Sequence, residues 1–143
     1  MNYEEDLYKE IILENYRSKK NKGAIEGASF HAEGANPSCG DDLELFLSVN
    51  NGVIERITYD GIGCSICCAG ANLLCEALTG RSFEEALGIV AQFKGMLLEE
   101  QEPDFDDAIS DLEAMQGVKK YPVRIKCALL AWNTVEGILN DAK

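Results

Sequence analysis

Three cysteines and one aspartate lie at separate points of the chain, in settings that suit metal ligands. Cys39 and Asp41 share the turn-forming segment Asn36-Pro37-Ser38-Cys39-Gly40-Asp41, Cys64 ends a glycine-bearing loop, and Cys127 lies just inside an expected helix start. Three thiolates and one carboxylate would complete a tetrahedral shell for a borderline-soft divalent ion. If these four groups meet in space, the chain holds a metal, and zinc is the first ion to consider.

Two further cysteines leave the ligand set open. Cys67 and Cys68 follow Cys64 by three and four residues, so on a helix one of them could approach the ion. Asp41 would then only cap its own turn. The alternative shell is Cys39, Cys64, Cys67 and Cys127. The other interpretation is that Cys67 and Cys68, like Cys75, are small residues that pack a helix.

Composition limits the class of protein. The chain has 143 residues, enough for one domain, and 25 acidic against 13 basic residues give a formal charge of −12. Such a charge disfavours binding to nucleic acid or to anionic membranes. The acidic N-terminus and the lack of a long apolar run predict a cytoplasmic protein. Six cysteines in that compartment indicate metal binding or catalysis rather than disulfides.

The apolar periodicity predicts an α+β fold. Helical spacing over 7–16, with Asn2 as a possible N-cap, precedes three strands expected at about 28–33, 43–49 and 53–59. Asn51-Gly52 predicts the hairpin between the last two strands. Helices are expected over 65–78, from a Ser82–Glu85 capping box to about 98, over 106–115, and from Pro122 onward. This order predicts a small three-stranded antiparallel sheet with helices packed on one face.

Three segments together resemble a known family. They are Asn36-Pro37-Ser38-Cys39-Gly40-Asp41, Gly61-Ile62-Gly63-Cys64-Ser65-Ile66 and Arg124-Ile125-Lys126-Cys127-Ala128. In this order they are similar to the signature segments of the U-type iron–sulfur cluster assembly proteins, IscU and SufU. The resemblance covers nearly the whole chain and implies a single domain, 1–143, with the fold of the SufE/NifU-like proteins.

The SufU branch is the better match. An acidic helical segment at about 99–118 looks like the insertion of that branch, Lys126 stands where IscU proteins have a histidine, and Lys120-Tyr121-Pro122-Val123 replaces their proline-rich segment. The resemblance implies a zinc ion held by Cys39, Asp41, Cys64 and Cys127. It also implies that Cys39 accepts sulfur from a cysteine desulfurase and that downstream cluster-assembly proteins are partners. Cys67 and Cys68 depart from the family pattern, which has serine and small residues there.

Three functions are therefore expected as alternatives. The first is a zinc-dependent sulfur acceptor, and the second is a scaffold on which an iron–sulfur cluster is built at the same ligands. The third is a zinc module with a purely structural role.

Overall fold

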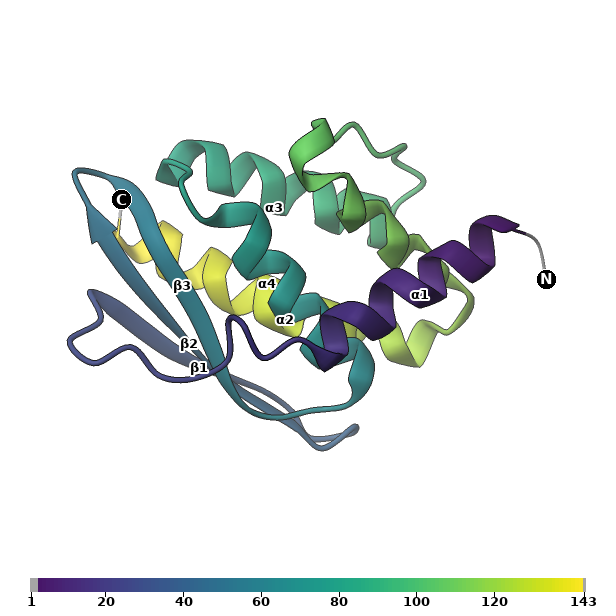
Figure 1. The fold of residues 1–143 in the computed structure, drawn as a ribbon, viewed down its shortest axis with the longest axis horizontal. Coiled ribbons are helices and arrows are strands. Elements are labelled where there is room, and N and C mark those ends of the chain that lie inside the picture. Colours follow the sequence, from purple (N-terminus) through teal and green to yellow (C-terminus); the bar gives the residue numbers. More distant parts are fainter. Residues whose placement is uncertain (1–2, 143) are drawn as a thin grey trace.

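The computed structural model describes residues 3–142, which form one antiparallel sheet and five helical segments joined by loops. In chain order they are α1 (Tyr3–Arg17), β1 (Phe30–Asn36), β2 (Asp41–Asn50), β3 (Val53–Ile62), α2 (Ser65–Leu78), α3 (Phe83–Leu98), the 3₁₀ segment η1 (Asp107–Lys120) and α4 (Pro122–Ala142). The helices lie against one side of the sheet (Figure 1). The predicted α+β architecture is confirmed.

The sheet has the strand order β1-β2-β3, and both pairings are antiparallel. The hairpin between β2 and β3 turns at Asn51 and Gly52, whose φ angles of 53° and 76° are the left-handed values that Asn and Gly tolerate best. Alternate residues of β2, Leu43, Leu45 and Leu47, are buried beneath the helices. The period-two pattern in the sequence therefore marks the inner face of the sheet.

Close packing of α2 against α4 sets the position of the cysteine-bearing helix ends. A side chain at Gly70 of α2 would lie 2.8 Å from the carbonyl oxygen of Ala128 in α4, so only glycine allows this approach. Trp132 of α4 donates from Nε1 to the Gly70 carbonyl at 3.1 Å and stacks on Phe93 of α3 at 3.9 Å. The N-terminal ends of α2 and α4 are thereby held together.

Several predicted boundaries differ from the structure. β1 begins and ends later than the expected 28–33, because its pairing with β2 continues to Asn36 opposite Asp41. The expected helix at 106–115 is a 3₁₀ segment that reaches Lys120 and is kinked at Ile109. α1 starts at Tyr3, and the N-cap expected at Asn2 lies outside the described residues.

The acidic segment is anchored rather than detached. Within η1 the apolar side chains of Ile109, Leu112, Met115 and Val118 are buried. The acidic side chains between residues 99 and 111 are exposed, as expected for a solvated face. No helix among residues 3–142 is long and apolar enough to cross a bilayer.

Candidate metal centre

Two segments that are far apart in sequence meet at one end of the molecule. The sulfurs of Cys39 and Cys127 and a carboxylate oxygen of Asp41 all lie within 4.8 Å of one another. Cys39 and Asp41 flank the start of β2, and Cys127 lies in the second turn of α4. The structure thus brings together three of the four predicted ligands.

A tight turn between β1 and β2 positions Cys39. The backbone N–H of Cys39 donates to the Asn36 carbonyl at 3.1 Å, and that of Gly40 donates to the Pro37 carbonyl at 3.3 Å. Gly40 has a φ of +72°, which an L side chain rarely adopts, and it returns the chain to β2. Cys39 is therefore held at the tip of the turn, where its thiol is half-buried.

Asp41 is buried, with 2% of its surface exposed, and it bonds across elements. Its Oδ1 accepts the backbone N–H of Cys64 at 2.9 Å, and its Oδ2 accepts from Nδ2 of Asn36 at 3.5 Å. A carboxylate that only capped its own turn would bond within that turn. Asp41 instead ties the start of β2 to the start of α2, with an oxygen facing the thiols of Cys39 and Cys127.

Cys64 lies beside this group rather than inside it. It is the N-cap residue of α2, with extended backbone angles, and its side chain makes no capping hydrogen bond. Its thiol is half-buried and close enough to Cys127 for a hydrogen bond between the two side chains. Cys64 therefore lies at the N-terminal end of α2, next to the three donors that form the close group.

Cys127 is fully buried among polar groups. Burial raises the pKa of its thiol most, and hydrogen bonds with Cys39, Asp41 and Cys64 raise that pKa further. The guanidinium of Arg124 faces the same thiols, and a hydrogen bond to Cys127 raises the pKa of Arg124. Arg124 therefore offsets part of the negative charge that the ligand set would concentrate here.

The donor set fits a thiolate-binding divalent ion. Sulfur atoms bound tetrahedrally at about 2.3 Å from zinc lie roughly 3.8 Å apart. The spacing of up to 4.8 Å between the donors of Cys39, Asp41 and Cys127 requires shifts of only about an ångström to reach that geometry. Soft sulfur donors dominate the group, which excludes a magnesium or calcium type of site.

The remaining cysteines lie outside the close group. Cys67 is buried next to Gly63, the thiol of Cys68 donates to the Gly63 carbonyl at 3.5 Å, and Cys75 is buried in the core. All six cysteines are free thiols. His31 is exposed on β1 and pairs with Glu44 at 3.3 Å, away from the thiols.

Sequence reasoning did not single out Asn36. This residue ends β1 opposite Asp41, and its Nδ2 donates to Asp41 and, at 3.6 Å, to the sulfur of Cys127. The hydroxyl of Ser38 donates to Oδ1 of Asn36 at 2.9 Å, which turns the amide nitrogen toward the ligands. An amide residue ending the strand before a Cys-x-Asp turn is the signal that could have identified it.

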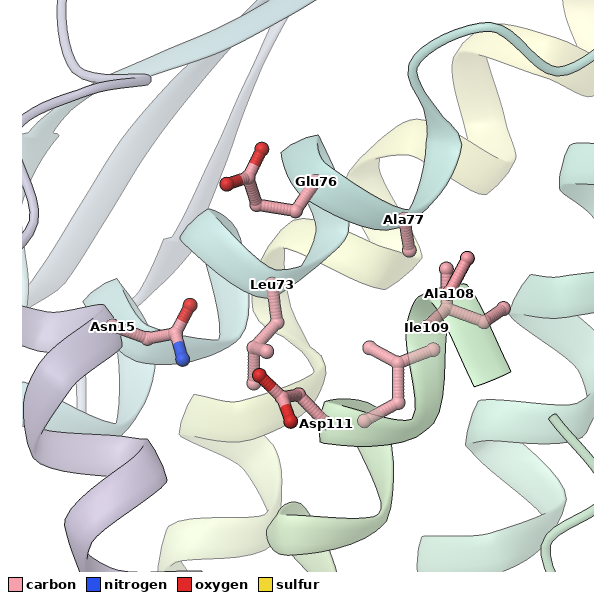
Figure 2. Close-up of a pocket in the computed structure, with 8 residues that line it drawn as sticks. Asn15, Leu73, Glu76, Ala77, Ala108, Ile109 and Asp111 are labelled. Carbon is pink, nitrogen blue, oxygen red and sulfur yellow. The ribbon is translucent and has the colours of Figure 1, made fainter. Parts of the chain in front are cut away.

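Two hollows differ in their chemistry. One, of about 640 Å³, lies over Cys39 and is lined by Ser38 and residues 120–124. The other, of about 320 Å³, lies between α1, α2 and η1 and is lined by Asn15, Leu73 and Asp111 among others, with no thiol (Figure 2). Of these two hollows, the one over Cys39 has a candidate ligand in its lining.

Comparison with known proteins decides the family. Residues 7–128 match the family described as the NifU-like N terminal domain. The chain belongs to this family. The membership inferred from the three cysteine segments is confirmed.

Similar proteins carry two different names. The zinc-dependent sulfurtransferase SufU of Bacillus subtilis is 37% identical over 132 residues, which are 91% of this chain and 87% of that protein. The iron-sulfur cluster assembly scaffold protein IscU of Thermotoga maritima is 36% identical over 134 residues, 93% of this chain and 92% of that protein. A crystal structure of a putative scaffold protein for the SUF system from Fervidobacterium islandicum superimposes with a TM-score of 0.85 at 35% identity, covering 91% of this chain and 94% of the other.

Proposed function

We propose that this protein is a zinc-dependent sulfur acceptor of the SufU type, which takes persulfide sulfur from a cysteine desulfurase. The observation that carries the proposal is the half-buried Cys39 thiol, which lines an open hollow and lies within 4.8 Å of donor atoms of Asp41 and Cys127. The 37% identity to a zinc-dependent sulfurtransferase supports it.

Zinc would be held by Cys39, Asp41, Cys64 and Cys127. Two of these groups, Asp41 and Cys127, are buried, whereas the thiols of Cys39 and Cys64 reach the surface in part. Bound zinc would keep the Cys39 thiolate ready but weakly nucleophilic. The single oxygen ligand makes the shell easier to rearrange than one made only of cysteine and histidine.

Cys39 would be the residue that accepts sulfur. Its position on a turn lets a persulfide enter through the hollow lined by residues 120–124, whereas Cys127 is out of reach. A desulfurase group that replaced Cys39 among the ligands would release its thiolate. The Cys39 thiolate then attacks the outer sulfur of the donor persulfide, the donor S–S bond breaks, and the electron pair leaves with the desulfurase thiolate.

The surface around the hollow suits a protein partner. Tyr121 and Val123 are exposed apolar side chains, with 60% and 66% of their surfaces accessible. Tyr121 and Val123 line the hollow itself. Exposed apolar side chains next to a reactive thiol are typical of a docking surface, and the desulfurase is the proposed occupant.

Other parts of the proposal follow from the family. The chain would act as one domain in the cytoplasm, with residues 99–118 as an insertion and with downstream cluster-assembly proteins as further partners. The scaffold function is the alternative, and the 36% identity to an IscU scaffold favours keeping it. There the same cysteines would hold an iron–sulfur cluster.

Anaerobic purification followed by metal analysis separates these functions. Transfer predicts one zinc per chain and no visible absorption, whereas scaffolding predicts iron, sulfide and a brown chromophore. Labelled sulfur from a desulfurase should appear on the wild type and not on Cys39→Ala. A Cys39→Ala protein that accepted sulfur at the normal rate would exclude Cys39 as the acceptor.

The ligand set is tested with two variants. Asp41→Ala should lose zinc, and Cys67→Ser should retain it. Retention in the first and loss in the second would favour the shell of four cysteines instead.

A further inference from the structure

A fourth thiol lies at the edge of the metal centre and has no part in the mechanism above. Cys67 is in the first turn of α2, one turn after Cys64, and only 1% of its surface is exposed. Helical side chains lean toward the N-terminus of their helix. The Cys67 sulfur therefore points toward the end of α2 that carries Cys64 and meets Asp41.

Gly63 shows how close Cys67 is to the centre. A Cβ atom at residue 63 would lie 2.9 Å from the Cys67 sulfur and 3.4 Å from Oδ1 of Asp41. Gly63 does not have a positive φ, so backbone conformation does not require glycine there. The missing side chain instead leaves the space that the Cys67 sulfur and the Asp41 carboxylate share.

The thiol of Cys68, the next residue, has different contacts. The Cys68 sulfur donates to the Gly63 carbonyl at 3.5 Å, and the charge that acts most strongly on it is that of Lys22, ahead of Cys64 and Asp41. The Cys67 thiol makes no hydrogen bond within residues 3–142, and the charge that acts most strongly on it is that of Asp41. Of the two adjacent cysteines, only Cys67 faces the ligands without a partner of its own.

We propose that Cys67 is a reserve ligand, which takes the position on the metal that Cys39 vacates when Cys39 carries sulfur. This inference rests on the proposed sulfur-acceptor function. With Cys67 engaged, the ligands are Asp41, Cys64, Cys67 and Cys127. Four-coordination, which zinc prefers in protein sites, is then kept after the desulfurase has left.

The exchange needs no oxidant or reductant. The S–H bond of Cys67 breaks as its sulfur binds the metal, because only the thiolate is a ligand. The released proton goes to the thiolate that the donor cysteine leaves behind when Cys39 takes its terminal sulfur. Charge is balanced at the centre because one cysteine thiolate replaces another.

Counting sulfur ligands by X-ray absorption of the zinc-loaded protein tests the inference. Zn–S bonds of about 2.3 Å are distinguished from Zn–O and Zn–N bonds of about 2.0–2.2 Å. The wild type should show three sulfurs and one oxygen. Cys39→Ala removes one sulfur ligand, and it should nevertheless show three sulfurs because Cys67 replaces Cys39.

Adding a second substitution removes the replacement. Cys39→Ala/Cys67→Ser should show two sulfurs and bind zinc at least tenfold more weakly in chelator competition than Cys39→Ala. The matched control, Cys39→Ala/Cys68→Ser, should keep three sulfurs. If serine at 67 prevents folding, Cys39→Ala/Cys67→Ala takes its place with the same expected count.

Three results would overturn the reserve role. They are two sulfurs or no zinc in Cys39→Ala, an unchanged sulfur count on adding the Cys67 substitution, and four sulfurs in the wild type. None of these readouts depends on sulfur transfer. The proposed function fails separately, if the wild type takes no labelled sulfur from a desulfurase.

Discussion

Cys127 and Cys75 are two thiols on helices, each with 0% of its surface exposed, and their neighbours differ completely. Cys127 lies among Cys39, Asp41 and Asn36. Cys75 lies in the core, and its one charged influence is the adjacent Glu76. Burial raises the pKa of both thiols and is the largest cause in each case.

Burial alone therefore does not distinguish a ligand from a packing residue. The difference lies in the polar groups that the fold has brought to Cys127 from a turn about ninety residues earlier in the chain. A thiol with such neighbours can exchange its proton for a metal, whereas Cys75 can only remain neutral.

Removing each thiol in turn should give the largest contrast. Cys127→Ala should weaken zinc binding by more than about a hundredfold, because loss of a ligand exceeds the 10–100-fold effect of losing an outer partner. Cys75→Ala should bind zinc normally and lower the free energy of unfolding by about 1–2 kcal/mol, through a small cavity. Zinc stoichiometry with chelator competition, and urea denaturation, measure the two effects. Equal zinc loss in both variants would contradict the assignment of Cys127 as a ligand and Cys75 as a packing residue.

The next-largest effect concerns the side-chain amide of Asn36, which donates to Cys127 but not to Cys75. Asn36→Ala removes the donor to Asp41 and Cys127 while leaving every ligand in place. Zinc binding should weaken by about 10–100-fold, the usual cost of losing a partner that orients ligands. Ser38→Ala is the comparison variant, because the Ser38 hydroxyl orients the Asn36 amide and has only a long contact of 4.0 Å with the Cys39 sulfur, so its removal should cost less. If chelator competition showed a greater loss of zinc affinity in Ser38→Ala than in Asn36→Ala, this role of Asn36 would be refuted.

Local signals in the sequence predicted much of the fold. Ser82 and Glu85 form the expected capping box, with Oγ of Ser82 accepting at 3.2 Å and Oε1 of Glu85 accepting at 3.0 Å. The hairpin at Asn51-Gly52 and the helix over 65–78 are also as predicted. Each of these depends on residues within one or two turns of each other, which is why the local pattern was enough.

The candidate site was only partly accessible from the sequence. Spacing and residue type indicated Cys39, Asp41 and Cys127, but their proximity depends on the packing of α4 against the sheet, where Leu130 and Thr134 lie close to Gly34 of β1. The contribution of Asn36 depends on the register of β1 with β2, which no local pattern fixes. The 3₁₀ form of residues 107–120 was missed because buried apolar side chains, rather than helix propensity, set its path.

At alkaline pH, the contribution of Cys75 to the stability of the metal-free, reduced protein should become measurable. Its pKa is raised above the ordinary value of 9.0, so it stabilises the fold below pH 9.0 and this contribution is lost as the pH rises toward the folded-state pKa. The free energy of unfolding of the wild type minus that of Cys75→Ala should fall by about 1.4 kcal/mol per pH unit above that value. Urea denaturation from pH 8 to about 11 measures it. A constant difference would show that Cys75 is not desolvated.

The smallest expected effect belongs to the exposed charge beside Cys127. Arg124 hydrogen bonds to the Cys127 thiol and faces Cys64, whereas no cation among residues 3–142 acts on Cys75. Arg124→Gln should weaken zinc binding only a few-fold, because an exposed guanidinium is screened by water and salt. The loss should be larger at low ionic strength than at high, since screening already removes the contribution of Arg124 in high salt. Arg56→Gln on β3 alters the net charge equally without touching the thiols, so a salt-dependent loss of the same size there would assign the effect to overall charge rather than to Arg124.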